Sequence, residues 1–173
     1  MNIKPEALKY FIECVGTNMQ DIINEIRKLI EYAGTNGTIE KEAVEKLTIK
    51  KIESVIFDLT DSIGKKDIEK SLEVLRNLLY TKEPIQKILI TLYNHFKKLY
   101  ITKHAINVNK DVGQSLKLKP NQTFLINKYR TQAKYFSEKE LNKILQELRD
   151  LDYDYKKGTI DIQIGLEAII CKI

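Results

Sequence analysis

Apolar residues return every three or four positions along almost the whole chain, and this spacing predicts helices rather than strands. Before position 34 they form one stripe, made of Ile22, Ile23, Ile26, Leu29, Ile30 and Ala33. A longer stripe follows Pro84 and is the expected buried face of the longest helix: Ile85, Ile88, Leu89, Leu92, Phe96, Leu99 and Tyr100. We therefore predict an all-α fold, a bundle of about three helices followed by a larger bundle of about six or seven.

Residues typical of helix N-termini stand just before several of the apolar segments. Asn18, Ser54, Asp67 and Ser137 each stand where a side-chain oxygen would accept a backbone N–H of the first helical turn. Ser137 is followed three positions later by Glu140, which completes a predicted capping box. Only 7 Gly and 3 Pro occur in the chain, and so few helix breakers favour long helices.

The composition indicates a folded protein without a membrane span. No run of about 18 apolar residues occurs, so no transmembrane helix is predicted and the cytoplasm is the expected compartment. Cys14 and Cys171 lie far apart in apolar helical surroundings and are expected to be buried, reduced thiols. His95 and His104 are nine residues apart, which misses the spacing of two metal ligands on one helix face, so no metal site is expected.

No residue pattern points to catalysis or to a bound cofactor. Gly64-Lys65-Lys66 lacks both the preceding strand and the hydroxyl that a phosphate-binding loop needs. Carboxylates that could share a proton or a cation form two groups, Asp58 with Asp61, and Asp150 with Asp152 and Asp154. Because apolar and aromatic residues of amphipathic helices surround both groups, solvated or salt-bridged carboxylates are the better interpretation. We predict no catalytic, cofactor-binding or metal-binding residue.

Positive charge is concentrated in the middle of the chain. Residues 82–135 carry 11 basic and 2 acidic side chains, whereas residues 1–81 carry 12 basic and 14 acidic ones. One interpretation is a solvated helix face, and another is a surface that meets a phosphate backbone or an acidic partner. The candidate contacts to DNA or to another subunit, by charge or by aromatic stacking, are Lys97, Lys98, Lys103, Lys128, Arg130, Lys134, Tyr93, Tyr100 and Tyr129.

The basic segment also has the outline of a helix-turn-helix. Its first helix would contain Val112, Leu116 and Leu118, and a break at Pro120 would precede the second. The second helix would present Asn121, Gln122, Asn127, Lys128 and Arg130 to the major groove. Two short helices joined by a tight turn are also common in helical bundles, so the spacing alone leaves both interpretations open.

Several segments resemble, in order, the C-terminal region of the delta subunit of the bacterial DNA polymerase III clamp loader. They are Ile22 to Leu29; Ile56-Phe57-Asp58-Leu59 with the turn from Gly64 to Asp67; Leu72 to Leu79; Glu83-Pro84 and the helix to Lys103; Val112 to Leu118; Tyr135-Phe136-Ser137; and Asp152 to Gly158. The first resembles the helix that ends the family's small lid domain, and the others resemble its collar domain. The expected division is therefore a lid part at 1–50 and a collar at 51–173, with the polar residues 48–53 at the junction.

The resemblance implies a subunit that is not itself catalytic, within a DNA-directed DNA polymerase holoenzyme that acts in DNA replication. Collars of AAA+ clamp loaders pack together in a ring, so the implied partners are the delta-prime and tau/gamma subunits. The sliding clamp would be reached only through an N-terminal domain, and the chain is expected to be the C-terminal part of a longer subunit. No cofactor is implied, because Gln20 stands where ATP-binding relatives carry an arginine that senses the γ-phosphate.

These observations support two functional hypotheses. In the first, the chain is a helical assembly module that holds a clamp loader together. In the second, it is a small helical nucleic-acid-binding protein that uses the basic segment 82–135. Salt separates the two, because binding to phosphates weakens steeply as salt rises, whereas apolar helix packing does not.

Overall fold

The computed structural model describes residues 2–80 and 83–173, which form ten α-helices, one 3-10 helix and two strands of two residues each. The predicted all-α fold is thus confirmed. The chain divides into two compact units, Met1–Ser54 and Val55–Ile173. The division falls within the first turn of α4 (Ile52–Gly64), directly after the polar segment that was expected to join two domains.

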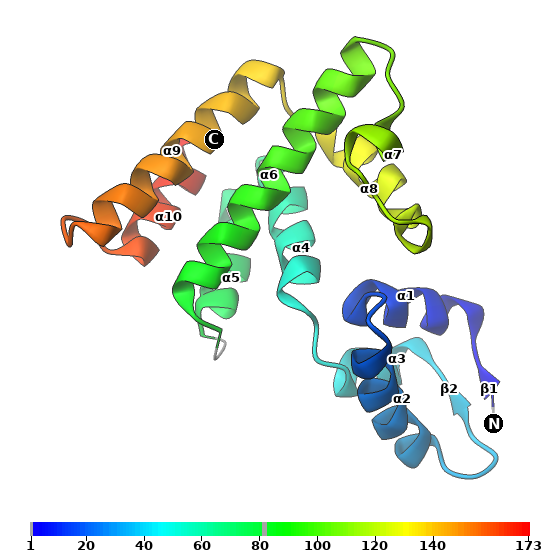
Figure 1. Cartoon of the computed structure of the whole chain (residues 1–173). Helices are drawn as coiled ribbons and strands as arrows, with labels where there is room; N and C mark the ends of the chain where they lie inside the picture. The colour runs from blue at the N-terminus through cyan, green and yellow to red at the C-terminus, as the bar shows by residue number, and fades with distance from the viewer. Residues whose placement is uncertain (1, 81–82) are drawn as a thin grey trace. The chain divides into compact units, whose positions relative to one another are not determined.

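The first unit contains three complete helices, α1 (Pro5–Val15), α2 (Met19–Ala33) and α3 (Lys41–Leu47) (Figure 1). Two short strands, β1 (Asn2–Ile3) and β2 (Thr38–Ile39), pair in parallel, with Ile3 opposite Ile39. The sequence did not predict them, because two residues are too few to show an alternating pattern. The core of this unit consists of Ala7, Phe11, Cys14, Val15, Leu29, Ile39 and Val44.

Local sequence explains most helix ends in the first unit. The Asn18 side chain accepts two backbone N–H groups of α2, at 3.0 and 3.2 Å, which confirms the predicted cap. Gly16 and Gly34, with φ of 75° and 72°, end α1 and α2 in a conformation that favours glycine. The predicted cap at Ser54 is wrong, because α4 already begins at Ile52, whose side chain is buried.

The second unit is a bundle arranged around α6, the longest helix. Its members besides α4 are α5 (Ile68–Leu79), α6 (Ile85–Asn107), α7 (Val112–Ser115), the 3-10 helix Pro120–Gln122, α8 (Phe124–Ala133), α9 (Glu138–Lys156) and α10 (Ile162–Lys172). Figure 1 shows α9 on one side of α6 and α7 with α8 on the other, and α6 packs against all three. Helix α10 packs against α9 and α5.

The buried face of α6 agrees with the prediction over most of its length. Five of the seven expected residues are buried, namely Ile88, Leu89, Leu92, Phe96 and Leu99. Ile85 and Tyr100 are half-buried. The structure adds His95, Thr102 and Ala105 to this face, of which the two polar residues were outside the apolar pattern.

Two helix starts in the second unit are confirmed in detail. Asp67 accepts the backbone N–H of Lys70 at 3.0 Å and caps α5. The Ser137 hydroxyl accepts the Glu140 N–H at 3.1 Å, and the Glu140 carboxylate accepts the Ser137 N–H at 2.7 Å, which is the predicted capping box. Because these bonds stabilise the ionised carboxylate, they lower the pKa of Glu140.

The two cysteines differ in their surroundings. Cys14 is buried in the first unit, as expected, but Cys171 is exposed on α10. The expectation of two buried thiols is therefore wrong for Cys171. The helical period explains the error, since Ile162, Leu166 and Ile169 define the buried side of α10 and position 171 lies on the opposite side.

Candidate interaction surface

The predicted contact residues lie on α6 and at α8, but they differ in exposure. Lys97, Arg130 and Lys134 are exposed. The half-buried residues are Tyr93, Lys98, Tyr100, Lys103 and Lys128, and Tyr129 is buried. The nine side chains thus do not make up one exposed surface, and several of them have partners inside the second unit.

Tyr129 packs in an aromatic cluster with Phe57 of α4 and His95 of α6. The ring centroids of Phe57 and His95 are 4.4 Å apart, and that of Tyr129 lies 5.0 and 5.4 Å from them. The ammonium of Lys98 lies 5.8 Å from the Tyr129 centroid, and that of Lys128 lies 5.4 Å from the Phe57 centroid. The expectation that Tyr129 offers its ring for base stacking is corrected, because the ring belongs to the core.

Lys103 has a structural contact as well. Its Nζ donates a hydrogen bond to the carbonyl oxygen of Ala133, at 3.2 Å, at the last residue of α8. A cation at this position is favourable, because the carbonyl groups at a helix C-terminus carry a partial negative charge. Lys103 therefore joins α6 to α8.

Buried polar side chains link three helices next to the aromatic cluster. His95 Nε2 lies 2.8 Å from Gln132 Oε1. The amide nitrogen of Gln132 donates to the carbonyl oxygen of Phe57 at 2.9 Å and to Asp61 Oδ1 at 2.7 Å. Because both amide protons of Gln132 are used on α4, its oxygen is the acceptor, and His95 carries its proton on Nε2.

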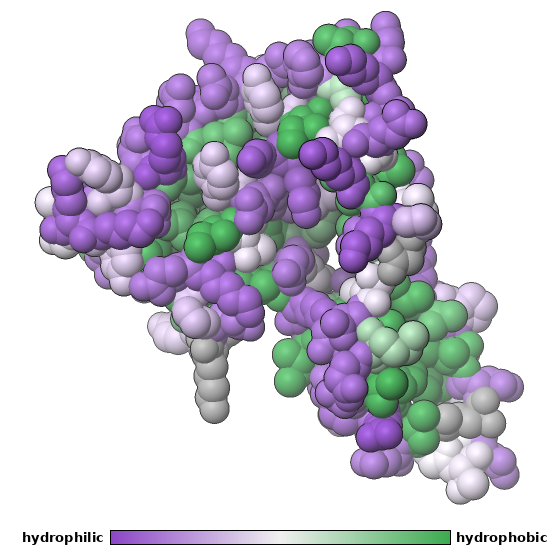
Figure 2. All heavy atoms as spheres, in the orientation of Figure 1, coloured by the Kyte–Doolittle hydropathy of each residue, from purple (hydrophilic) through white to green (hydrophobic). Residues whose placement is uncertain are grey.

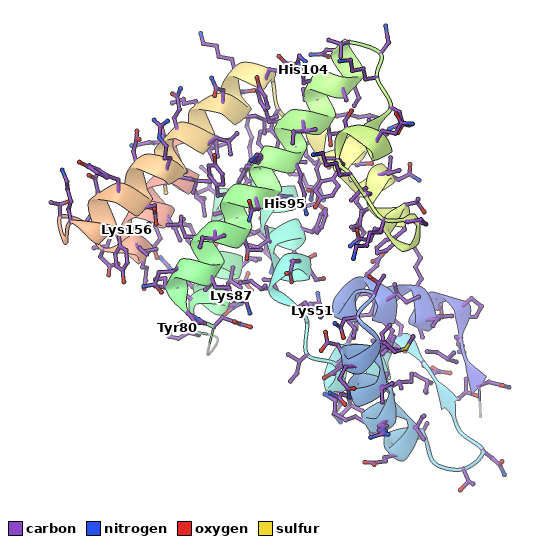
Figure 3. All side chains as sticks on the ribbon, viewed as in Figure 1. Lys51, Tyr80, Lys87, His95, His104 and Lys156 are labelled. Atoms are coloured by element: carbon purple, nitrogen blue, oxygen red, sulfur yellow. The ribbon has the colours of Figure 1, made fainter. Side chains whose placement is uncertain are left out.

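Burial lowers the pKa of His95 to about 3, and the hydrogen bond to Gln132, which acts in the opposite direction, does not compensate. The imidazole is therefore neutral at physiological pH. Figure 3 labels His95 in the middle of α6, with His104 nearer the end of the helix. A neutral ring that is hydrogen-bonded inside a bundle acts as a packing group.

At least three of the five carboxylates noted in the sequence have partners in the fold. Asp61 accepts the Gln132 amide. On α9, Asp150 forms an ion pair with Arg149, and Asp152 forms one with Lys156. Among the residues that the structure describes, no group of three or more His, Cys, Asp or Glu side chains could hold a metal ion.

The segment with the outline of a helix-turn-helix has a different geometry. Helix α7 is a single turn that ends at Ser115, so Leu116 and Leu118 follow it instead of belonging to it. Lys128, expected on a recognition helix, lies over the Phe57 ring. The segment therefore does not form a helix-turn-helix that reads the major groove of DNA, although its spacing allowed one.

A basic corner that the sequence did not single out lies where α4 and α8 end and α9 begins. It consists of Lys65, Lys66, Lys134 and Lys139, all exposed. Gly64 brings these segments together, because a Cβ atom there would lie 2.3 Å from the Tyr135 ring. After the capping hydrogen bonds, the charges of Lys66 and Lys103 also lower the pKa of Glu140, which places both cations near this carboxylate.

Among the described residues, none of the four lysines of the basic corner lies within ion-pair distance of an acidic side chain. Lys65 and Lys66 were missed because they stand outside 82–135, in the turn after α4. Lys139 was missed because it stands in the first turn of α9, also outside that range. A signal was present in the sequence, since Lys65-Lys66 directly follows a helix-ending glycine.

Apolar side chains are also exposed on the second unit. Ile164 on α10 and Ile90 on α6 are 64% and 57% exposed. Figure 2 shows separate hydrophobic patches within a largely hydrophilic face of this unit. Exposed apolar side chains of this kind are candidates for burial against another protein. In the part of the chain that the structure describes, no helix is both long and apolar enough to cross a membrane.

Comparison with known proteins identifies the family. The family described as "DNA polymerase III delta subunit, C-terminal domain" matches residues 53–173. DNA polymerase III subunit delta of Bacillus subtilis is 29% identical over 174 residues, which cover 99% of this chain and 49% of that protein. The probable DNA polymerase III subunit delta of Aquifex aeolicus is 28% identical over 157 residues, which cover 88% of this chain and 44% of that protein.

A solved structure agrees with these matches. The Bacillus subtilis DNA clamp loader delta protein superimposes with a TM-score of 0.86 at 29% identity, over 98% of this chain and 50% of that one. The chain thus spans about half the length of the relatives it matches. Since the family match covers most of the sequence, the chain belongs to the family of the DNA polymerase III delta subunit, through the C-terminal domain of that family.

Proposed function

We propose that this chain is the C-terminal part of a clamp-loader delta subunit and holds the loader together by packing its helices against neighbouring subunits. The observation that carries the proposal is the likeness to the Bacillus subtilis clamp loader delta protein over 98% of the chain, at a TM-score of 0.86. The exposed isoleucines of α6 and α10 support it, because a module that acts by assembly needs apolar surface for its partners.

In this proposal the two parts of the chain belong to different domains of the subunit, and neither is catalytic. Residues 1–50 are the end of a lid domain, and residues 51–173 are the collar that makes the contacts between subunits. The partners are the delta-prime and tau/gamma subunits, and the sliding clamp is contacted by a domain outside this chain. The compartment is the cytoplasm, where replication proteins of bacteria act.

Size-exclusion chromatography with light scattering tests the proposal. The chain is run alone and with delta-prime and tau/gamma subunits, at low and at high salt. We expect it to enter a larger complex at both salt concentrations, because apolar contacts are not screened as charges are. Failure to enter a complex at either concentration contradicts the proposal.

Substitutions at exposed positions locate the contact. Ile90→Asp and Ile164→Asp each place a charge at an exposed apolar position of the second unit. Asn94→Asp is the matched control, because it introduces a carboxylate at an exposed polar position one turn after Ile90 on α6. We expect at least one isoleucine variant to lose the complex and the control to keep it. Equal binding by all three variants excludes both positions from the contact.

Contact with nucleic acid is the second candidate function, and the unpaired lysines of the basic corner favour it. Cations without acidic partners on one surface raise the local potential and attract phosphates. Lys97 and Arg130, from the predicted set, are also exposed. The contact would be with the phosphate backbone and independent of sequence, because no recognition helix is formed.

Binding of a labelled single-stranded oligonucleotide at several salt concentrations tests this second function. Lys134→Gln combined with Lys139→Gln removes two charges of the basic corner. The control combines Lys143→Gln with Lys156→Gln, two lysines of α9 that form ion pairs with acidic residues. If the basic corner binds phosphates, the first variant weakens binding and reduces the salt slope by about 0.7 for each lost contact. Identical slopes for the two variants contradict a role for the corner.

A further inference from the structure

An aromatic side chain stands among the lysines of the basic corner. Tyr135 follows Lys134 directly in the chain, between the end of α8 and the start of α9. Its side chain is 37% exposed, whereas the next residue, Phe136, is buried. Tyr135 thus differs from Tyr129, whose ring belongs to the core and offers no surface to a ligand.

Gly64 and Phe136 hold the Tyr135 ring in place. A Cβ atom at residue 64 would lie 2.3 Å from Cδ2 and 2.6 Å from Cγ of Tyr135, so the ring rests directly on the glycine backbone. The ring of Phe136 meets it at an interplanar angle of 84°, with the centroids 6.4 Å apart. The fold therefore positions the Tyr135 ring before any ligand arrives, which reduces the entropy that binding must cost.

The chain places cations around this ring. Lys134 precedes Tyr135 in the sequence, and Lys65 and Lys66 directly follow the glycine on which the ring rests. Lys139 lies in the first turn of α9, four residues after Tyr135. The ammonium groups thus come from three segments that meet at the ring, and a polyanion that crosses the ring meets cations from more than one of them.

The two glutamates in the first turn of α9 are engaged inside the protein. The Glu140 carboxylate accepts the Ser137 N–H of the capping box at 2.7 Å. Glu138 Oε1 accepts the side-chain amide of Asn107 at 3.0 Å and lies 3.4 Å from Nδ1 of His104. Neither carboxylate lies within ion-pair distance of the lysines of the basic corner. Within the described part of the chain, these lysines therefore stay available to an external anion.

An exposed aromatic ring among cations is the combination that binds single-stranded nucleic acids, because a base stacks on the ring while the cations contact the backbone. The faces of a base inside a duplex are covered by its neighbours, so only an unpaired base can stack on a protein ring. We propose that Tyr135 is a stacking platform for one unpaired base and that the lysines of the basic corner contact the flanking phosphates. This role rests on the proposed contact with nucleic acid, and it limits the ligand to a single strand.

Fluorescence of the full 173-residue chain tests the stacking directly. The chain contains no tryptophan, so Tyr135→Trp introduces a single indole at the proposed site. We expect a single-stranded oligodeoxythymidylate to quench its emission about twofold or more at low salt, because a stacked base quenches an indole, and a blunt duplex of the same length to leave it nearly unchanged. Tyr32→Trp is the matched control, since Tyr32 is an exposed tyrosine of the first unit with the Lys46 ammonium 5.9 Å from its ring centroid. The emission of this control should not change.

Affinity for the same oligonucleotide at several salt concentrations gives a second readout. Tyr135→Leu removes the ring and should weaken binding about tenfold without changing the salt slope, because no charge is lost. Tyr135→Phe keeps the ring and should bind as the parent chain does. Thermal unfolding checks that both variants fold, and if Tyr135→Leu does not, the quenching in Tyr135→Trp decides alone.

The possible failures are distinguishable. A parent chain that binds no oligonucleotide at any salt concentration contradicts both the contact with nucleic acid and the stacking platform. If the parent chain binds, but Tyr135→Trp is not quenched and Tyr135→Leu keeps its affinity, the phosphate contact stands and the platform alone is overturned. Equal quenching by the duplex overturns the restriction to a single strand. An oligouridylate run in parallel separates the two sources of such a strand, and stronger quenching by either the DNA or the RNA supports the platform.

Discussion

His95 and Gln132 meet inside the second unit through a hydrogen bond of 2.8 Å, although they are far apart in the sequence and belong to different helices. Gln132 uses its two amide protons on α4, so this one side chain joins α4, α6 and α8. An apolar residue in its place would leave buried polar atoms on two neighbouring helices without partners. A buried polar group that is fully hydrogen-bonded favours one arrangement of the surrounding helices over its alternatives.

Gln132→Leu should therefore destabilise the second unit although it keeps the size of the side chain. It leaves the N–H of His95 and the carboxylate of Asp61 without their partner, and the expected loss is about 1–3 kcal/mol in the free energy of unfolding. Urea unfolding followed by circular dichroism measures this loss. Gln146→Leu, at an exposed position of α9, is the control and should change the stability by less than about 0.5 kcal/mol. Equal losses in the two variants would show that the network contributes nothing.

The lowered pKa of His95 makes the stability of the second unit depend on pH. The folded pKa is about 3, below the ordinary value of 6.5, so the unfolded chain binds more protons between these values. Stability is then complete above the unfolded pKa and is lost as the pH falls from about 6.5 towards 3. The expected loss is about 2 kcal/mol between roughly pH 7.5 and 5, a range in which most carboxylates stay ionised.

Urea unfolding at a series of pH values measures this dependence. His95→Leu should flatten the curve of unfolding free energy against pH, whatever its effect on absolute stability. His104→Leu removes a half-exposed histidine of the same helix and should keep the slope of the parent chain. A parent slope that survives in His95→Leu would mean that other groups cause it.

The sequence predicted those features that depend on neighbouring residues. The caps at Asn18, Asp67 and Ser137 are each made by a side chain and a backbone N–H two or three residues later, so the residue type alone carries the information. The apolar face of α6 was found because its period repeats over a long helix.

The features that the sequence did not predict depend on residues far apart in the chain. Tyr129 is apolar enough to be buried and aromatic enough to stack on a base, and only its packing against Phe57 decides between these roles. The basic corner exists because Gly64 lies against Tyr135. The hydrogen bond between the Ile49 N–H and the Glu25 carboxylate joins residues 24 positions apart, and no local pattern predicts it. The family resemblance identified the fold correctly, but it did not locate these contacts.

Replacing Lys117 by glycine should stabilise the folded protein. Its φ is 52°, a left-handed conformation at the end of α7 that costs a residue with a Cβ atom about 1–2 kcal/mol. Glycine avoids this cost, but its greater backbone freedom in the unfolded chain lowers stability by about 0.5–1 kcal/mol. Lys117→Gly should therefore raise the free energy of unfolding by about 0.5–1 kcal/mol. Thermal unfolding measures the gain. Lys119→Gly is the matched control, because Lys119 has a φ of −72° and should only lose stability. A loss in both variants would contradict the strain at Lys117.

Gly165 shows how closely α10 approaches α9. A Cβ atom at this position would lie 2.1 Å from Cδ1 of Leu151, a distance at which the leucine must move. Alanine is favoured over glycine in a helix by about 1 kcal/mol, but overpacking a buried contact costs about 1–3 kcal/mol. Gly165→Ala should therefore destabilise the second unit, as measured by urea unfolding.

The decisive comparison is the same substitution in a chain that already carries Leu151→Ala. Leu151→Ala removes the atoms that clash, at its own cost of about 2–5 kcal/mol. In that background Gly165→Ala should be neutral or stabilising, because only the better helix propensity of alanine remains. A change of sign between the two backgrounds measures the coupling between the two residues, which is the purpose of a double-mutant cycle. If Gly165→Ala lowers the stability equally in both backgrounds, the contact with Leu151 is not the reason that position 165 requires glycine.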